Sequence, residues 1–415
     1  MADATPGPAV GALAPTAALN SPLLNQVALG YSACIDRHHA IMATRLTVLP
    51  LRPNGVLDAA QLLAVVVDVW PADGARVLLN IASEDLLRDV LNASLPANLL
   101  LEVPGFMATD AQYSAALSAL HARGNTLLLK GWPLRELPRD VRTCFAQVIV
   151  DLEDVAGEID LAHAGAHQLP QIVAGVRSTV QMNACFARGA HAVLGWPIEA
   201  ALPATGLRSN GVMAPGLHVI VELIQLVTQQ APIDKLEATL KRDPPLAFKL
   251  LRYINSPAFG LRVEVSSFGH AVMLLGYQRL KRWLALLLVS ASANATLKPI
   301  MFAAVRRGLL MEELARHSDD AEMRDEMFIC GVFSLLDQML QQPFAALLSA
   351  IPVPERVRQT LVDQAGPFQP YMDIVQAAEN ASLYDLRDAA GRLMLSHGEV
   401  NRAVLRAARA ATLLE

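Results

Sequence analysis

The sequence predicts two domains of different classes, an α/β barrel followed by an all-helical domain. From about residue 25 to 200, short apolar runs alternate with amphipathic stretches, which is the pattern of repeated strand–helix units. From residue 216 onward the apolar residues recur with helical spacing, which predicts helices alone. The chain has 415 residues, too many for one ordinary core, so two domains are expected.

The strands expected in the first domain are short, mostly continuous apolar runs. They cover residues 27–31, 41–49, 76–82, 99–103, 126–130, 147–152, 170–175 and 191–195. Buried strands separated by helices indicate a parallel sheet whose outer face is covered. Eight such strands predict a (β/α)8 barrel of the TIM type with an irregular first strand. A doubly wound open sheet is the alternative, but no Gly-rich phosphate-binding motif follows any of these runs.

The domain boundaries follow from changes in composition. Residues 1–22 are rich in Ala and Pro and predict a disordered tail. Residues 23–200 form the expected barrel. Pro, Gly, Ser and Asn accumulate over residues 201–215 and the apolar periodicity stops there, which predicts a linker. Residues 216–415 form the expected helical domain.

Composition and charge exclude several classes of function. No apolar run approaches the about 20 residues of a membrane helix, and the longest, 283–293, predicts a buried core helix. The N-terminus lacks the basic start of a secretory signal. A net charge of −5 opposes nucleic-acid binding. The cysteines include no Cys-x-x-Cys pair, which fits a reducing cytoplasm without structural zinc; they are Cys34, Cys144, Cys185 and Cys330.

The carboxyl ends of the barrel strands are where reacting groups would lie. Asn80, Glu102 and Asp151 stand there together with Lys130. Two carboxylates and one amide are too few for a two-metal phosphoryl-transfer site, and Lys130 adds a positive charge where such a site needs negative ones. We therefore expect no catalytic residues, no bound metal and no cofactor.

Four segments of the first half stand in a diagnostic order, namely YSACIDRHHAIMATRLTVLP, VLLNIASEDLL, LLLEVPGFM and GAHAVLGWPI. This half resembles an EAL domain, the cyclic di-GMP phosphodiesterase barrel, in the variant that precedes an HDOD domain. The resemblance implies that Asn80, Glu102 and Asp151 occupy metal-ligand positions of that family.

The same resemblance implies that the other functional positions are substituted. The signature glutamate falls near Thr44 or Arg45, and Lys130 with Gly131 replaces a pair of aspartates. The lysine position of the Lys-x-Asp element is an isoleucine, and two later glutamate positions are an alanine and an arginine; these are Ile149, Ala174 and Arg177. The resemblance therefore implies a degenerate EAL domain.

The second half contains IDKLEATLKRDPPLAFKLLRYINSPAFG, followed by VSSFGHAVMLLGYQRLKRWLALLL, CGVFSLLDQML and IPVPERVRQTLVDQAGPF. These segments resemble an HDOD domain, a helical relative of the HD phosphohydrolases, in which a His–Asp pair binds metal. Ser334 and Leu335 stand at the position of that pair. The resemblance thus implies that the helical domain holds no metal either.

Three smaller features have two interpretations each. His163 and His167 are four residues apart, as metal ligands on a helix would be, but solvated histidines are expected. The acidic residues of 319–326 fit a helix start capped by Ser318 better than a calcium loop. A basic patch lies beside an aromatic residue and consists of Arg279, Lys281, Arg282 and Trp283. The HDOD resemblance implies a protein-docking surface there, and contact with DNA or a nucleotide is the alternative.

The combined prediction is a bacterial signalling or scaffold protein without catalysis, which acts through protein–protein interactions. Its resemblance links it to cyclic di-GMP regulation of motility, biofilm or virulence, with other signalling proteins as partners. One alternative is a receptor that binds cyclic di-GMP without metal. Another is a residual phosphodiesterase that uses Asn80, Glu102 and Asp151.

Overall fold

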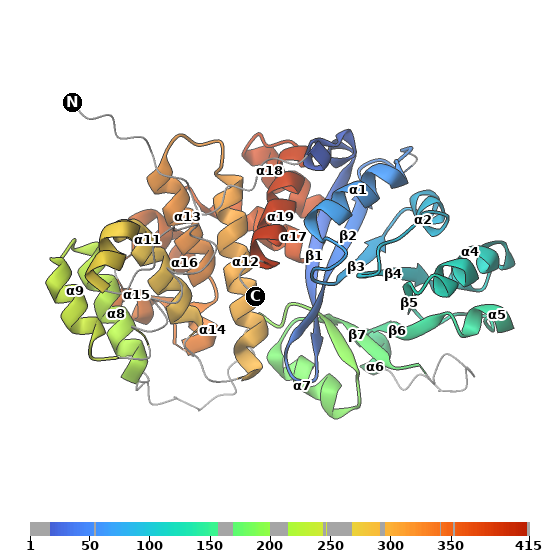
Figure 1. The fold of residues 1–415 in the computed structure, drawn as a ribbon, viewed down its shortest axis with the longest axis horizontal. Coiled ribbons are helices and arrows are strands. Elements are labelled where there is room, and N and C mark those ends of the chain that lie inside the picture. Colours follow the sequence, from blue (N-terminus) through green and yellow to red (C-terminus); the bar gives the residue numbers. More distant parts are fainter. Residues whose placement is uncertain are drawn as a thin grey trace.

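The computed structural model describes residues 17–53, 55–156, 169–199, 215–243, 246, 268–290, 295–340, 342–351 and 353–412. The chain begins with a β-barrel and ends with a helical region, and the helix α12 (Lys298–Leu314) runs between the two (Figure 1). Among the described residues, no helix has the length and apolar character needed to cross a membrane.

Eight strands close into one barrel in chain order. They are β1 (Val27–Asp36), β2 (Ile41–Pro50), β3 (Val77–Ile81), β4 (Leu99–Pro104), β5 (Thr126–Lys130), β6 (Phe145–Asp151), β7 (Gln171–Val176) and β8 (Ala192–Gly195). The predicted eight-stranded barrel is confirmed at this level.

The first strand departs from the all-parallel arrangement that a (β/α)8 barrel implies. Strand β1 is antiparallel to both of its neighbours, β2 and β8, whereas β2 to β8 pair in parallel. Only residues 37–40 join β1 to β2, and so short a connection can join antiparallel strands only. The irregular first strand that the sequence predicts is therefore antiparallel, and the barrel departs from the TIM type at this strand.

Helices follow most of the parallel strands, and several begin at a side chain that caps the backbone. Asp58, Ser83, Asp110 and Ser178 each accept a hydrogen bond from a backbone N–H in the first turn, which satisfies a donor that has no helical partner. The helices are α1 (Ala59–Val69), α2 (Glu84–Leu91), α3 (Gly105–Ala108), α4 (Ala111–Ala122), α5 (Arg139–Arg142), α6 (Leu152–Ala156) and α7 (Thr179–Ala187).

The interior of the barrel changes from apolar to polar along the strands. Apolar side chains fill the part of the interior that lies nearer the amino ends of the parallel strands, among them Leu78, Leu100 and Leu128. Because side chains on one face of a strand recur every two residues, the next inward positions are Asn80, Glu102 and Lys130. A polar layer therefore lies on the apolar plug at the carboxyl ends of the strands.

The second half is helical over its described residues, as predicted. Its helices are α8 (Pro215–Thr228), α9 (Ile233–Leu240), α11 (Phe268–Ser290), α12, α13 (Ala321–Phe333), α14 (Leu336–Leu340), α15 (Phe344–Ala350), α16 (Glu355–Asp363), α17 (Gln369–Glu379), α18 (Leu383–Arg392) and α19 (His397–Thr412). Within α11, Gly276 has a φ of 70° that breaks the helix, where the sequence predicts a helix end at this glycine.

The C-terminal helices pack on the barrel itself. Helices α17 and α19 contact β1, and both lie beside it in Figure 1. The fully buried Asn401 of α19 donates hydrogen bonds to the carbonyl oxygens of Leu24 and Val27, at 2.7 and 2.8 Å, and accepts one from the backbone N–H of Leu29 at 3.0 Å. These helices therefore cover the strand that has no barrel helix of its own.

Candidate functional site

A cavity of about 1130 Å³ opens at the carboxyl ends of the barrel strands. Its walls combine charged and aromatic side chains, among them Arg45, Phe106, Lys130, Trp132, Arg135 and Asp151. We call this cavity the barrel mouth. Of the polar layer described above, Lys130 lines this cavity.

The strongest interaction of the barrel mouth joins β2 to β4. Arg45 donates from Nε and Nη2 to the two carboxylate oxygens of Glu102, both at 2.6 Å. The Glu102 side chain is 0% exposed. Burial lowers the pKa of Arg45, but the charge and hydrogen bonds of Glu102 outweigh this and hold the pKa above its ordinary value. Arg45 therefore stays charged, and its contact with Glu102 is bidentate.

A second cation lies against the same polar layer. Lys130 donates from Nζ to Oδ1 of Asn80 at 2.8 Å, and its Nζ is 4.0 Å from Glu102. The amide of Asn80 in turn donates to the hydroxyl of Thr47 at 3.3 Å. Burial, joined by the repulsion of Arg45, lowers the pKa of Lys130, and the attraction of Glu102 opposes this only in part.

This set of oxygen atoms does not fit a divalent metal. Both oxygens of Glu102 and the oxygen of Asn80 already accept hydrogen bonds from cations. Asp151 lines the cavity beside Ile149 and Ala174, which offer no side-chain oxygen. In the part of the chain that is described, no three His, Cys, Asp or Glu residues group closely enough to hold a metal ion.

Thr44 and Arg45, near which the resemblance places the signature glutamate, point to opposite faces of β2. Arg45 points into the barrel mouth, whereas Thr44 faces outward and accepts a hydrogen bond at 2.9 Å from Nη2 of Arg306 on α12. Of the three predicted ligand positions, Asn80 and Glu102 share Lys130 as a neighbour. Asp151 lines the barrel mouth, whereas Asn80 and Glu102 lie below it and do not.

A second cavity, of about 380 Å³, lies between the barrel and the helical region. We call it the interdomain cavity. Its walls include Tyr31, Arg45, Arg177, Trp196, Arg307 and Glu379. No periodicity or motif in the sequence signalled it, because it combines barrel segments with helical segments that lie more than 100 residues further along the chain. Arg45 lines both cavities.

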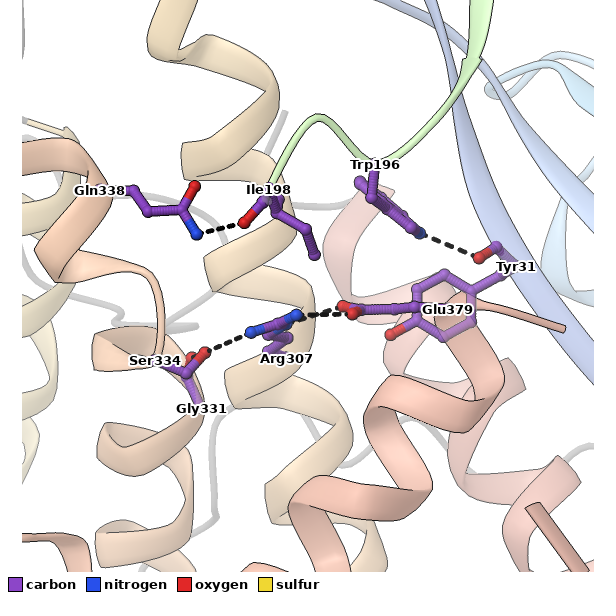
Figure 2. Close-up of polar contacts among 8 residues, drawn as sticks. All are labelled: Tyr31, Trp196, Ile198, Arg307, Gly331, Ser334, Gln338 and Glu379. Carbon is purple, nitrogen blue, oxygen red and sulfur yellow. Dashed lines mark hydrogen bonds and ion pairs between the residues drawn. The ribbon is translucent and has the colours of Figure 1, made fainter. Parts of the chain in front are cut away.

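Hydrogen bonds lie on both sides of the interdomain cavity, and one of them, from the side-chain amide of Gln338 to the carbonyl oxygen of Ile198, joins α14 to the segment after β8 (Figure 2). Arg307 of α12 donates to both carboxylate oxygens of Glu379 on α17, at 2.8 and 2.7 Å, and to the hydroxyl of Ser334 at 3.1 Å. On the barrel side, the indole N–H of Trp196 donates to the carbonyl oxygen of Tyr31 at 3.0 Å.

The buried Arg307 remains charged. Burial lowers its pKa, but the charge and hydrogen bonds of Glu379 outweigh this and raise the pKa above its ordinary value. Ser334 stands where the resemblance places the metal-binding pair of the HD phosphohydrolases. A guanidinium group therefore lies beside this position as well.

The predicted docking patch on α11 needs correction. Trp283 is 3% exposed, and Leu280 and Leu284 are buried with it on one face of the helix. Arg282 is 16% exposed and pairs with Glu312 at 2.7 Å and with Asp325 at 3.2 Å. These side chains hold helices together instead of forming an open surface.

Arg279 and Lys281, the other two members of the patch, are half-buried. Burial is the main cause that lowers the pKa of Lys281. Little of the predicted patch therefore remains for a partner to contact.

The two remaining features have different outcomes. His163 and His167 lie outside the described residues. The acidic cluster marks the start of α13, but the capping residue is Asp320, which accepts from the backbone N–H of Met323 at 2.9 Å. Ser318 instead accepts from the backbone N–H of Asp320 at 3.2 Å.

The fold is thus a closed eight-stranded barrel followed by a helical region, and comparison with known proteins adds a family for the second part. Residues 214–343 match the HDOD domain family, so the predicted HDOD resemblance is confirmed over this range. The chain carries an HDOD domain behind its barrel.

Two curated relatives align with about two fifths of the chain. Cyclic di-GMP phosphodiesterase CdgJ of Vibrio cholerae is 26% identical over 166 residues, which are 40% of this chain and 38% of the relative. Uncharacterized protein YuxH of Bacillus subtilis is 27% identical over 161 residues, which are 38% of this chain and 39% of the relative. The alignments therefore span well under half of each relative.

Solved structures of EAL proteins align with a similar share of the chain. The PaMucR phosphodiesterase in complex with cyclic di-GMP has 18% identity and a TM-score of 0.31, over 43% of this chain and 93% of that one. The FimX EAL domain from Pseudomonas aeruginosa bound to cyclic di-GMP has 14% identity and a TM-score of 0.30, over 44% of this chain and 94% of that one.

Proposed function

We propose that this chain is a cytoplasmic bacterial signalling protein without catalytic activity, which acts in cyclic di-GMP regulation by binding other proteins. In this proposal the barrel is a degenerate EAL-like barrel of the TIM type, and residues 23–200 and 216–415 are its two domains. The link to cyclic di-GMP is supported by the similarity to CdgJ, whose name describes a cyclic di-GMP phosphodiesterase.

The observation that carries the proposal is the pairing of the barrel-mouth oxygens with cations. A divalent ion at Glu102 would have to displace Arg45 from a buried bidentate pair. It would then lie close to two fixed positive charges, Arg45 and Lys130, whose repulsion is strong in a partly buried site. Remnant ligand positions at Asn80, Glu102 and Asp151 would thus be insufficient to assemble a two-metal centre.

The experiment is an assay of cyclic di-GMP hydrolysis by the full chain at high protein concentration with Mg²⁺ or Mn²⁺. We expect no turnover above the protein-free blank, and the same result for Asp151→Asn. Metal-dependent turnover that Asp151→Asn abolishes would replace the proposal with a residual phosphodiesterase.

A second candidate function, a metal-independent receptor for cyclic di-GMP, is favoured by the composition of the barrel mouth. The cavity is large enough for a nucleotide, and it combines the cations Lys130 and Arg135 with the aromatic side chains of Phe106 and Trp132, which suit phosphates and bases respectively. Calorimetric titration with cyclic di-GMP, with and without Mg²⁺, tests this. Equal affinity with and without Mg²⁺, together with weaker binding by Lys130→Met, supports the receptor. If tens of micromolar cyclic di-GMP releases or absorbs no heat of binding, partner binding remains as the function.

A further inference from the structure

Two buried arginines from different parts of the fold line the interdomain cavity. Arg45 reaches it from β2 and Arg307 from α12. Each is neutralised by one glutamate in a bidentate pair, Arg45 by Glu102 in the barrel mouth and Arg307 by Glu379 on α17. Because Arg45 also lines the barrel mouth, this side chain contacts both cavities.

Strand β2 connects the barrel mouth to α12 through consecutive residues. Neighbouring side chains of a strand point to opposite faces, so Arg45 faces the mouth while Thr44 faces outward and accepts a hydrogen bond from Arg306 at 2.9 Å. The guanidinium of Arg306 also lies over the ring of Tyr31, at 5.4 Å. A shift of β2 at Arg45 must therefore displace the contact that anchors α12.

Helix α12 carries this connection into the helical region. Arg306 contacts the barrel, whereas the next residue, Arg307, binds Glu379 and Ser334. Behind Arg307, Gly331 of α13 packs so closely that an added Cβ would lie 2.5 Å from the carbonyl carbon of Arg307. Packing this close leaves α12 little room to move independently of α13.

We propose that β2 and α12 couple the barrel mouth to the helical region, so that displacing Arg45 from Glu102 loosens the contacts of Arg307 with Glu379 and Ser334. A ligand or partner that engages the mouth would then change the stability of α17 and of the α13–α14 junction. The inference adds regulation to the proposed function and rests on it only for the identity of the ligand. Its test uses no ligand, so it can fail or succeed independently of the hydrolysis assay.

The test is hydrogen–deuterium exchange of the full chain, read by mass spectrometry, for the wild type, Arg45→Met and Lys130→Met. Lys130 is the matched control, because this cation lines the barrel mouth but does not line the interdomain cavity. We expect Arg45→Met to speed exchange in α17 and at residues 331–336 by about tenfold, as local stability falls. Lys130→Met should change exchange around the mouth only.

Circular dichroism establishes that each variant is folded before exchange is compared. If Arg45→Met does not fold, Glu379→Gln provides the reciprocal measurement, since coupling between two sites is mutual. Glu379→Gln should then speed exchange in β2 and β4 about tenfold, whereas the control Glu153→Gln, at an exposed position that lines neither cavity, should not. The proposal is overturned if the folded variants change exchange only in their own surroundings, or if Lys130→Met affects α17 as strongly as Arg45→Met does.

Discussion

At the scale of single residues, the barrel mouth is defined by a carboxylate that has cations as its neighbours. Glu102 is inaccessible to water and accepts both hydrogen bonds of Arg45, with Lys130 at 4.0 Å. A buried charge is tolerated only when it is paired and hydrogen-bonded, and the loss of one partner leaves the other charge uncompensated. The stability of the barrel should therefore depend on this pair.

Replacing Glu102 by Gln should lower the free energy of unfolding by about 3 kcal/mol, the usual cost of breaking a buried ion pair. Urea denaturation followed by circular dichroism measures this. The control is Asp85→Asn in the exposed pair of Asp85 with Arg88, where at most about 1 kcal/mol is expected. Equal losses for both variants would show that the Arg45–Glu102 pair has no special role in stability.

Lys130 should acylate at lower pH than an ordinary surface lysine. Burial lowers its pKa, so a larger fraction of the amine is neutral and nucleophilic at a given pH, while the side chain remains 41% exposed to reagent. Competitive labelling with an amine-reactive ester across a pH series, quantified by mass spectrometry, measures the midpoint. The exposed Lys241 is the internal reference, and a Lys130 midpoint at or above that of Lys241 would contradict the prediction.

At the scale of elements, one side chain of α19 replaces the missing hydrogen-bond partners at the start of the barrel. Asn401 contacts the backbone of Leu24, Val27 and Leu29, 372 to 377 positions earlier in the chain. Buried backbone groups without a partner are costly. Helix α19 is thus required for the local structure of β1.

Asn401→Ala should lower the free energy of unfolding by about 2–3 kcal/mol, because three buried backbone groups lose their partner. Chemical denaturation of the full chain measures the loss. Asn380→Ala, at an exposed position that ends α17, should be nearly neutral and serves as the control. A neutral Asn401→Ala would indicate that water satisfies these groups.

The close packing of α12 against α13 leads to a second prediction about the helices. An alanine Cβ at Gly331 would lie 2.5 Å from the backbone nitrogen of Gly308, so Gly331→Ala should destabilise the protein by about 2 kcal/mol or more through overpacking. Gly391→Ala in α18, where a Cβ would meet nothing within 4 Å, should instead stabilise it by about 0.5–1 kcal/mol. Thermal unfolding of the two variants compares them, and the opposite order would refute the tight crossing.

Elements with a strong local pattern could be predicted from the sequence, and those that depend on distant partners could not. Each apolar run of the barrel became a strand, since buried strands and their helices have clear periodicities. The antiparallel β1 was missed, because strand direction depends on pairing and not on the run itself. The basic residues around Trp283 predict a surface position, but the helix turns this side chain toward the interior, where it is buried.

At the scale of the whole molecule, the described parts of the barrel and of the helical region pack directly against each other. Gly30 of β1 lies so close to the turn after α17 that an added Cβ would be 2.6 Å from the Cβ of Ala381, and Trp196 stacks on Phe302 of α12. Composition predicts two domains separated by a linker. Contacts between residues that are hundreds of positions apart leave no local sequence pattern, so composition does not predict how the two parts pack together. The interdomain cavity and its arginines were invisible to sequence patterns for the same reason.

In the proposed function, the side chains of Arg45 and Lys130, and not metal ions, bind the oxygen atoms of Glu102 and Asn80. Its most direct test is the electron paramagnetic resonance signal of free Mn²⁺, titrated with the full chain and with Glu102→Gln. We predict that neither protein reduces the free Mn²⁺ signal at equal concentrations. Stoichiometric Mn²⁺ binding by the wild type that Glu102→Gln abolishes would contradict the account.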